Sequence, residues 1–420
     1  MGLMLPKPVT SSIRERGGNE LFRYGSGCVN GFRENMEDAH LAYFRDNWAF
    51  FGVFDGHCND HCSMYLEKEW KSVCDSLTMP ITDERMKELS LAVDKKYLDD
   101  NPQGGSTGTF FLATRKGDKA ELQVGNVGDS RVIARIGGKP VSLTEDHKPT
   151  NDEERRRIQA CNGYVENARV NGSLALSRAF GDADYKRFEG GGQLNQQVIA
   201  LPDVTHATVD CSPTSTDFAV LACDGVFEGN FSNEEVIEFV GKQLETVTDL
   251  AVISYRVCIE AIARGSKDNI SCMVVQFKDG TAHGKTDGLK AYEFVPGPIA
   301  APNHGGFRRA YWGMCQKGGL SPSQCLERRY DALTAEVKAS AGEEAVTLEA
   351  ELELFKEGPP KALAAGSPER IAWFDKIVQT FNSMGGGDSD PTATLLQLQQ
   401  RGIPLAAIVD ALQHGGGDDA

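Results

Sequence analysis

The chain has 420 residues, 40% of them hydrophobic, which is enough for one large domain with a smaller companion or for two to three average domains. Its formal net charge of -16 argues against a general nucleic-acid binder, which would present a basic face. No apolar run reaches the roughly 18 residues of a membrane-spanning helix. The 11 cysteines lie mostly inside apolar runs, which is typical of free thiols in a reducing compartment and predicts a cytoplasmic or nuclear location.

The first part of the chain is predicted to be a tail followed by a β-rich unit. Residues 1–20 are polar and weakly periodic, and we expect a tail or an edge segment there. Gly2 offers a partial signal for N-myristoylation, although the Ser or Thr preferred four residues later is absent. The aromatic run 47–54 has the length and composition of a buried strand. Apolar spacing predicts helices over residues 62–77 and 83–98.

The middle of the chain, up to residue 280, is predicted to contain further strands and helices. Further strands are predicted over residues 109–114, 120–127, 130–136 and 270–277. Helices are predicted over residues 151–161, 233–244 and 250–264, the first two from apparent capping boxes that begin at Thr150 and Ser232. Residues 170–200 are Gly-rich, polar and too long for a simple connection, which indicates a functional flap.

The last third has a different composition. Residues 281–320 are rich in Gly and Pro and are expected to be a linker. Residues 321–413 are rich in Ala, Leu and Glu and predict several helices without strands, with Ser-Pro pairs as helix starts. This helical region is expected to pack on the preceding domain or to bind a partner. Residues 414–420 are predicted to be a disordered tail.

Four aspartates stand at the ends of strand-like runs and are expected to converge on one site. They are Asp55, Asp129, Asp224 and Asp268. Two of them precede a glycine, which lets the backbone approach a ligand closely. Taken singly, Asp-Gly pairs are most often turns. Four such segments with the same placement favour a shared centre of hard oxygen ligands, which suits Mg²⁺ or Mn²⁺ and does not suit zinc.

Two further residues near the first aspartate have the chemistry of phosphoryl transfer. Arg33 can hold phosphoryl oxygens in a bidentate manner, and His57 can protonate a leaving alkoxide. Simpler interpretations exist for both. Arg33 could pair with Glu37, and His57 could cap the helix that follows it.

Nine motifs then occur in an order that resembles the metal-dependent Ser/Thr protein phosphatases of the protein phosphatase 2C type. They are R-E-N-M-E-D, F-D-G-H, G-N-V-G-D-S-R, D-H-K-P, G-Y-V, R-V-N-G-S-L-A-L-S-R-A-F-G-D, P-D-V, C-D-G-V-F-E and S-K-D-N-I-S. The resemblance covers residues 21–280. It implies an α+β fold, an α-β-β-α four-layer sandwich of two antiparallel sheets flanked by helices. It also implies hydrolysis of phosphoserine and phosphothreonine in phosphoprotein substrates by a water that two Mn²⁺ or Mg²⁺ ions activate.

The resemblance also implies a role for each matching residue. Metal ligation is implied for Asp55 as the bridging ligand, Gly56 through its carbonyl, Glu37, Asp224 and Asp268, with Asp129 at a weaker third ion. Phosphate binding is implied for Arg33, and general acid catalysis for His57. Orientation of the ligands is implied for Asp38 and for Glu228, which stands where the family usually has Asp. The flap is implied to include Gly172, Arg178, Gly181 and Asp182.

Three other kinds of protein are weighed against this interpretation. His61-Cys62 resembles the start of a cysteine-phosphatase motif, but position 68 is Lys and no glycine follows to cradle a phosphate. Four neighbouring His and Cys residues from His57 to Cys62 suggest zinc, yet ligands so close together cannot close a tetrahedron. A non-catalytic metal-binding scaffold would have lost a metal aspartate or Arg33, and this chain retains them all.

Overall fold

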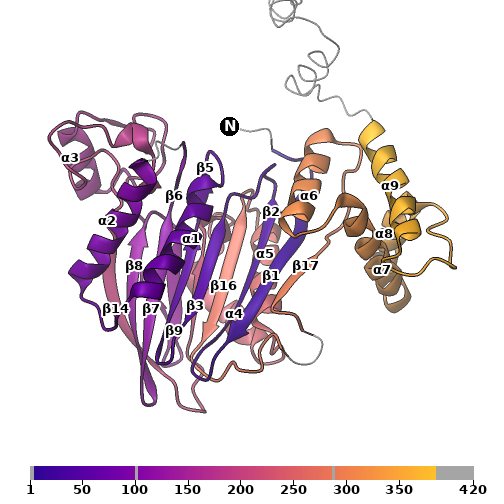
Figure 1. Cartoon of the computed structure of the whole chain (residues 1–420), viewed down its shortest axis with the longest axis horizontal. Coiled ribbons are helices and arrows are strands. Elements are labelled where there is room, and N and C mark those ends of the chain that lie inside the picture. The colour runs from indigo at the N-terminus through magenta and orange to yellow at the C-terminus, as the bar shows by residue number, and fades with distance from the viewer. Residues whose placement is uncertain (1–3, 100–102, 286–288, 385–420) are drawn as a thin grey trace, which may run out of the picture.

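Two antiparallel sheets face each other at the centre of the protein, and helices cover their outer faces (Figure 1). The computed structural model describes residues 4–99, 103–285 and 289–384. Helices α4 (Asn233–Gln243) and α5 (Leu250–Ala263) pack on one sheet, and α1 (His61–Ser76) and α2 (Asp83–Asp99) pack on the other. The four-layer α-β-β-α sandwich predicted from the motifs is therefore confirmed.

Each sheet draws its strands from distant parts of the chain, and every pairing in the two sheets is antiparallel. The seven-stranded sheet has the order β10 (Lys139–Ser142), β9 (Arg131–Ile136), β15 (Phe218–Ala222), β16 (Ile270–Gln276), β2 (Arg23–Gly31), β1 (Val9–Gly18), β17 (Tyr292–Val295). The five-stranded sheet has the order β14 (Asp203–Asp210), β8 (Lys119–Val127), β7 (Gly108–Lys116), β4 (Trp48–Phe54), β3 (Ala39–Phe44). Two small sheets consist of β13 (Phe180–Gly181), β6 (Gly105–Ser106) and β5 (Gly56–His57), and of β11 (Val165–Glu166) and β12 (Arg169–Val170).

The helices follow the apolar spacing of the sequence closely. In the described residues they are α1 (His61–Ser76), α2 (Asp83–Asp99), α3 (Asp152–Ala160), α4 (Asn233–Gln243), α5 (Leu250–Ala263), α6 (Gly305–Lys317), α7 (Pro322–Ala339), α8 (Glu343–Leu352) and α9 (Pro368–Ser383), with short turns η1 (Ala183–Tyr185), η2 (Asp224–Val226) and η3 (Glu353–Phe355). The capping box at Ser232 is present. The one predicted at Thr150 is wrong, because Asn151 occupies the cap position of α3 and makes no side-chain cap bond.

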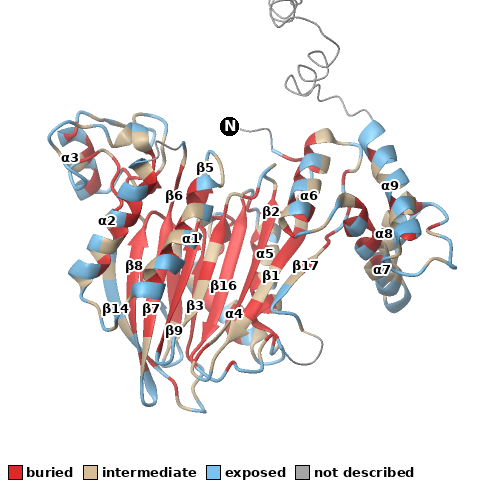
Figure 2. Ribbon diagram, in the orientation of Figure 1, coloured by how far each residue is buried: buried red, intermediate tan, exposed pale blue. Residues whose placement is uncertain are grey.

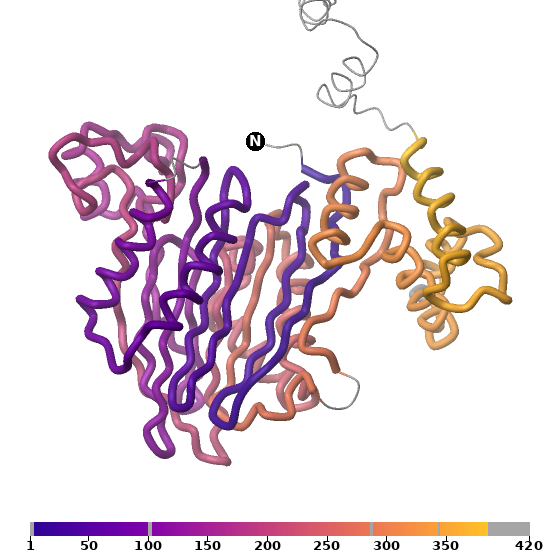
Figure 3. The backbone as a smooth tube through the Cα atoms, viewed as in Figure 1, coloured from indigo at the N-terminus to yellow at the C-terminus, as the bar shows by residue number. Residues whose placement is uncertain are grey.

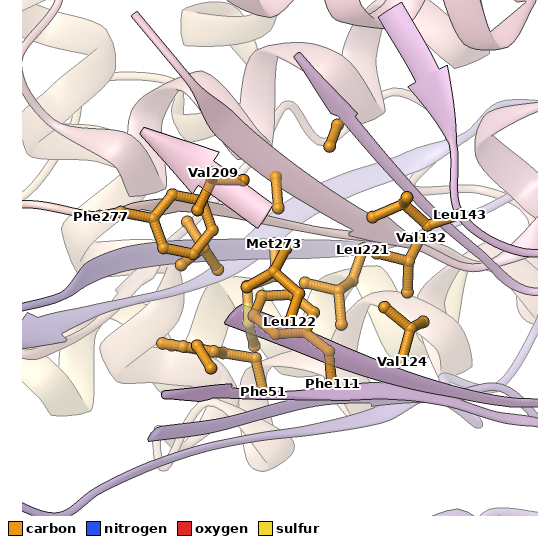
Figure 4. Close-up of a cluster of buried hydrophobic side chains, with 14 of the residues drawn as sticks. Phe51, Phe111, Leu122, Val124, Val132, Leu143, Val209, Leu221, Met273 and Phe277 are labelled. Atoms are coloured by element: carbon orange, nitrogen blue, oxygen red, sulfur yellow. The ribbon is translucent and has the colours of Figure 1, made fainter. Parts of the chain in front are cut away.

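The core between the two sheets is apolar and fully closed. Figure 4 shows its side chains meeting from both sheets, with Phe51 and Phe111 from one facing Leu221 and Met273 from the other. The central strands are buried along their whole length, as the red strands of Figure 2 show. A rigid two-sheet core of this kind fixes the strand ends from which a site can be built.

The predicted N-terminal tail is wrong, because Val9–Gly18 forms strand β1 inside the seven-stranded sheet. Its polar residues conceal it in the sequence. Arg16 is buried yet satisfied, since it donates to Asp249 (3.0 Å) and to Glu293 (3.0 Å), both more than 200 residues away. Such distant partners allow a strand with polar residues to be buried in a sheet, and local periodicity does not reveal them.

The predicted linker over residues 281–320 is also wrong, because it contains strand β17 and helix α6. Figure 3 shows how this segment leads from the sheet edge beside β1 to the C-terminal helices. Phe294 on β17 packs against Gly318, where an added Cβ could not fit. Helices α7 and α9 confirm the predicted Ser-Pro starts. The rest of the predicted helical region beyond residue 384, the tail 414–420 and Gly2 lie outside the described residues.

The cysteines and the helices agree with the remaining expectations from composition. All eleven cysteines are free thiols, and ten of them are buried. Cys62 lies in the apolar cluster between α1 and its sheet, together with Leu66 and Trp70, as a helix-face residue should. Among the described helices, none has the length and apolar character needed to cross a bilayer.

Candidate metal centre

Each sheet delivers one pair of aspartates to the same end of the sandwich. Asp38 directly precedes β3 and Asp55 directly follows β4, and Ala39 pairs with Phe54 in the antiparallel register, so the two aspartates are neighbours. Asp224 follows β15 and Asp268 precedes β16, which are also antiparallel neighbours. The convergence expected from strand-end positions therefore arises from two paired strand ends, one in each sheet.

The carboxylates form two compact groups. Ligand atoms of Asp38, Asp55 and Cys223 lie within 4.8 Å of one another, and so do those of Asp224, Glu228 and Asp268. Burial, followed by the charges of Asp38 and Asp224, raises the pKa of Asp55 well above its ordinary value. Burial, followed by the charge of Asp129, raises the pKa of Asp224 in the same way. A cation that binds between partly buried anions would relieve this repulsion.

Asp38 provides a specific test of whether metal ions fit this cluster. Its Oδ2 accepts a hydrogen bond from the Ser271 hydroxyl (2.6 Å), while its Oδ1 is buried with no hydrogen-bond partner among the described residues. Burial raises the pKa of Asp38 to about 6. A buried oxygen without a partner, next to the carboxylate of Asp55, is what a hard divalent cation requires. From the sequence, Asp38 was expected to orient the metal ligands without binding a metal itself. In the structure its carboxylate oxygen is instead grouped with that of Asp55.

Backbone contacts hold Asp55 and Gly56 in place. The N–H of Asp55 donates to the Thr107 hydroxyl (3.2 Å), and the N–H of Thr107 donates to the Asp55 carbonyl (2.9 Å). A Cβ at Gly56 would overlap the carbonyl oxygen of Glu37, so only glycine allows this approach. Glu37 thus lies against Gly56 through its backbone, and its carboxyl group has a pKa that burial raises.

Asp129 lies where the chain crosses from β8 in one sheet to β9 in the other, at the same end of the sandwich. Its carboxylate is buried and forms an ion pair with Lys148. Burial would lower the pKa of Lys148, but the charge of Asp129 raises it. The motif D-H-K-P contained this lysine, yet sequence reasoning assigned it no role, because nothing local shows that it reaches Asp129.

Arg33 lies at the open side of the cluster. Its Nη2 donates to Asp268 Oδ2 at 2.6 Å, and 56% of its side chain is exposed. The alternative pairing with Glu37 is thus not the one observed. A guanidinium has five N–H donors, and this bond uses one nitrogen, so Arg33 can remain on Asp268 and still face an incoming phosphoryl group.

His57 does not cap the following helix, since Asp60 occupies that position. Its Nε2 instead donates to the carboxylate of Asp182, at 2.8 and 2.9 Å. Strand β6 explains the contact, because His57 and Gly181 both pair with Gly105, from opposite sides. Gly105 has no side chain, so His57 and Asp182 meet across it. Burial would lower the pKa of His57, but Asp182 raises it above its ordinary value, which suits a proton donor.

The predicted flap residues divide into two sets. Asp182 contacts His57 and so belongs to the site. The neighbouring Gly181 has a positive φ of 74° and donates its N–H to Asp94 (2.8 Å). Arg178 is buried and anchors the flap by donating to Glu154 (2.8 Å) and Asp203 (2.7 Å). Gly172 occupies a turn where an added Cβ would lie 3.2 Å from Glu166 Oε2, and Glu166 belongs to neither carboxylate group.

Asn269 is a further residue that sequence reasoning missed. Its side chain accepts from the N–H of Glu37 (2.9 Å) and donates to the carbonyls of Asn30 (3.0 Å) and Asn35 (2.8 Å). It lies beside Asp268 in the motif S-K-D-N-I-S, and this position was the available signal. One amide therefore ties the strand end that carries Asp268 to the loop that carries Arg33 and Glu37.

Comparison with known proteins agrees with this geometry. Residues 22–270 match the family described as Protein phosphatase 2C. The chain is 34% identical to Protein phosphatase 1B of Mus musculus over 305 residues, covering 66% of this chain and 76% of that protein. It is also 34% identical to Protein phosphatase 2C homolog 2 of Schizosaccharomyces pombe over 301 residues, covering 67% and 80%. The crystal structure of a phosphatase from Toxoplasma gondii superimposes with a TM-score of 0.60 at 26% identity, covering 69% of this chain and all of that one. With two sheets presenting paired aspartates, an arginine and a histidine at one end, and with these relatives, the chain belongs to the protein phosphatase 2C family.

Proposed function

We propose that the two carboxylate groups are the metal centre at which this protein serine/threonine phosphatase hydrolyses phosphoserine and phosphothreonine. One observation carries the proposal. Asp38 and Asp55 from one sheet form one group, Asp224 and Asp268 from the other sheet form a second, and the charge of Asp224 acts on Asp55, with Arg33 at the open edge. A site with this composition binds a phosphoryl group between cations and a guanidinium.

The donor set fits two Mn²⁺ or Mg²⁺ ions. Asp38 and Asp55, with the carbonyl of Gly56, would hold one ion, and Asp224 with Asp268 would hold the other. Glu228 reaches the second group through its longer side chain, and Glu37 lies beside the first. Asp129 would serve a weaker third ion once Lys148 releases it. When bound, these ions supply the Lewis acidity that makes water nucleophilic near neutral pH.

The protein's own residues then bind and orient the substrate. Arg33 holds two phosphoryl oxygens and keeps the phosphorus in line with the attacking water. His57 donates a proton to the departing serine or threonine oxygen, and Asp182 keeps the imidazole ring oriented and protonated. The flap anchored by Arg178 borders this side of the site.

The proton donor can be tested through the leaving group. His57→Gln is expected to lower turnover by about a hundredfold for alkyl phosphates, because their alkoxide leaves poorly without a proton. Aryl phosphates, whose phenolate leaves readily, should lose much less. Asp182→Asn should show the same selectivity to a smaller degree. Equal losses for both substrate classes in steady-state assays would assign His57 a purely positional role.

The function itself is tested by phosphate release from a phosphothreonine peptide with Mn²⁺, and with Mn²⁺ removed by a chelator. Release that requires the metal is the expected result. Absence of release while calorimetry shows Mn²⁺ binding would instead identify a metal-binding scaffold, the alternative that the sequence left open.

The substrates, the C-terminal helices and the location follow from the same proposal. Phosphoproteins are the substrates that the family implies, and the C-terminal helices are proposed to serve the catalytic domain on which they pack. The free cysteines suit a reducing compartment, so a cytoplasmic or nuclear location is proposed on that basis.

A further inference from the structure

The loop of residues 32–38 joins β2 to β3 and has no regular secondary structure. It carries Arg33, Glu37 and Asp38, three of the residues assigned to the site. Because backbone ladders do not hold this loop, its position depends on contacts from elsewhere. Asn269 provides one set of these contacts. A second set comes from helix α6, far along the chain.

The last turn of α6 reaches two site loops at once. Lys317 Nζ donates to the carbonyl of Met36 at 2.6 Å, one residue before Glu37. The same ammonium lies 3.6 Å from Asp60 Oδ2, three residues after His57. Only 25% of the Lys317 side chain is exposed. A single partly buried cation thus bridges the loop that bears Arg33 and the segment that follows His57.

The N-terminal half of α6 contacts the same loop at a second point. Arg309 forms an ion pair with Glu34 at 3.3 Å. Gly306 allows this close approach, since an added Cβ would lie 2.8 Å from Glu34 Oε1. The Met36 side chain is buried in the apolar cluster that contains Phe307. Helix α6 therefore contacts the loop in three ways: at a backbone carbonyl, at a charged side chain and at an apolar side chain. Figure 1 shows α6 near the end of β2, from which this loop leaves.

We propose that Lys317 is a positioning residue of the phosphatase centre, through which the C-terminal helical region holds the loop 32–38 in its metal- and phosphate-binding conformation. The inference rests on the proposed function of that loop. It makes residues 292–383 part of the catalytic unit. Groups that orient ligands without touching the metal commonly change its affinity by 10–100-fold when removed.

The sign of the effect separates positioning from simple electrostatics. Lys317 is a positive charge near an acidic cluster, so its removal would by itself tighten the binding of a cation. Loss of positioning acts in the opposite direction, because Glu37 and Asp38 would no longer be held beside Asp55. A weaker affinity for Mn²⁺ after removal of a positive charge can therefore only reflect positioning.

The experiment compares the full chain with Lys317→Met, Lys317→Arg and the control Lys338→Met, which changes an exposed lysine on α7. Mn²⁺ affinity is measured by calorimetry, and KM and kcat with a phosphothreonine peptide. Lys317→Met should weaken Mn²⁺ binding by about tenfold and raise KM, because Arg33 moves with the loop. Lys317→Arg keeps both the donor and the charge and should stay within about twofold, as should Lys338→Met.

Unchanged or tighter Mn²⁺ binding in Lys317→Met would overturn the proposal. If that variant does not fold, as judged by its melting temperature, Lys317→Ala carries the same test, since it also removes both the donor to Met36 and the pair with Asp60. Failure of the proposed function is distinguishable, because the unmodified chain would then release no phosphate while its variants still differed in Mn²⁺ affinity.

Discussion

Asp55→Asn is expected to lower turnover by about a thousandfold and, at the same time, to stabilise the metal-free protein. The carboxylate is grouped with that of Asp38, and a neutral amide is a poor ligand for a hard cation. Loss of several kcal/mol of transition-state stabilisation corresponds to about three factors of ten in rate. Without metal, however, the same substitution removes an anion that Asp38 and Asp224 repel.

These opposite effects are measured by phosphate release with Mn²⁺ and by thermal unfolding in a chelator. Each kcal/mol of relieved repulsion should raise the melting temperature by about 2–4 °C. Asp46→Asn, at an exposed turn between β3 and β4, is the matched control and should change neither quantity. Near-normal turnover of Asp55→Asn at limiting Mn²⁺ would remove Asp55 from the metal centre.

A chain that ends at Asp279 is expected to lose its activity and most of its stability. It lacks β17 and α6–α9, which cover β1 and the apolar cluster that includes Leu5, Val9, Ile13 and Met36. Each such side chain contributes roughly 1.5–3 kcal/mol when buried. The free energy lost when these side chains become exposed is comparable with the net stability of a domain, about 5–15 kcal/mol.

The measurements are solubility, cooperative unfolding and phosphate release. A chain that ends at Met384 retains all of the described helices and serves as the control, with activity expected near that of the full chain. Faster release by the chain that ends at Asp279 would contradict this view and make the helical region an autoinhibitor.

The sequence predicted the parts of the site that consist of local motifs. Asp55, Asp224 and Asp268 each follow or precede an apolar run, and their placement at one edge follows from antiparallel pairing. The four-layer order of the sheets came from the resemblance, since local periodicity does not specify which strands become neighbours.

Contacts between segments that are distant in the sequence could not be predicted from local patterns. The pairing of Asp182 with His57 depends on both flanking one glycine in β6, and the pair of Lys148 with Asp129 depends on the crossing between sheets. β1 was not predicted, because an arginine such as Arg16 is typical of the surface. Only the folded chain brings Asp249 and Glu293 beside it, and these partners allow it to be buried. β17 is too short and lies too close to Gly and Pro for its pattern to indicate a strand.

The pairing of β1 with β17 joins the first and the last strand of the described residues, with Ser12 opposite Val295. During synthesis the ribosome releases β1 and β2 long before β16, which must pair with β2, and before β17, which must pair with β1. A nascent chain shorter than Ile270 therefore cannot assemble the seven-stranded sheet, and Lys317 emerges later still. Such long-range pairing slows folding and exposes strand edges in the meantime. The order of synthesis thus delays the completed active site until nearly the whole described chain has been made.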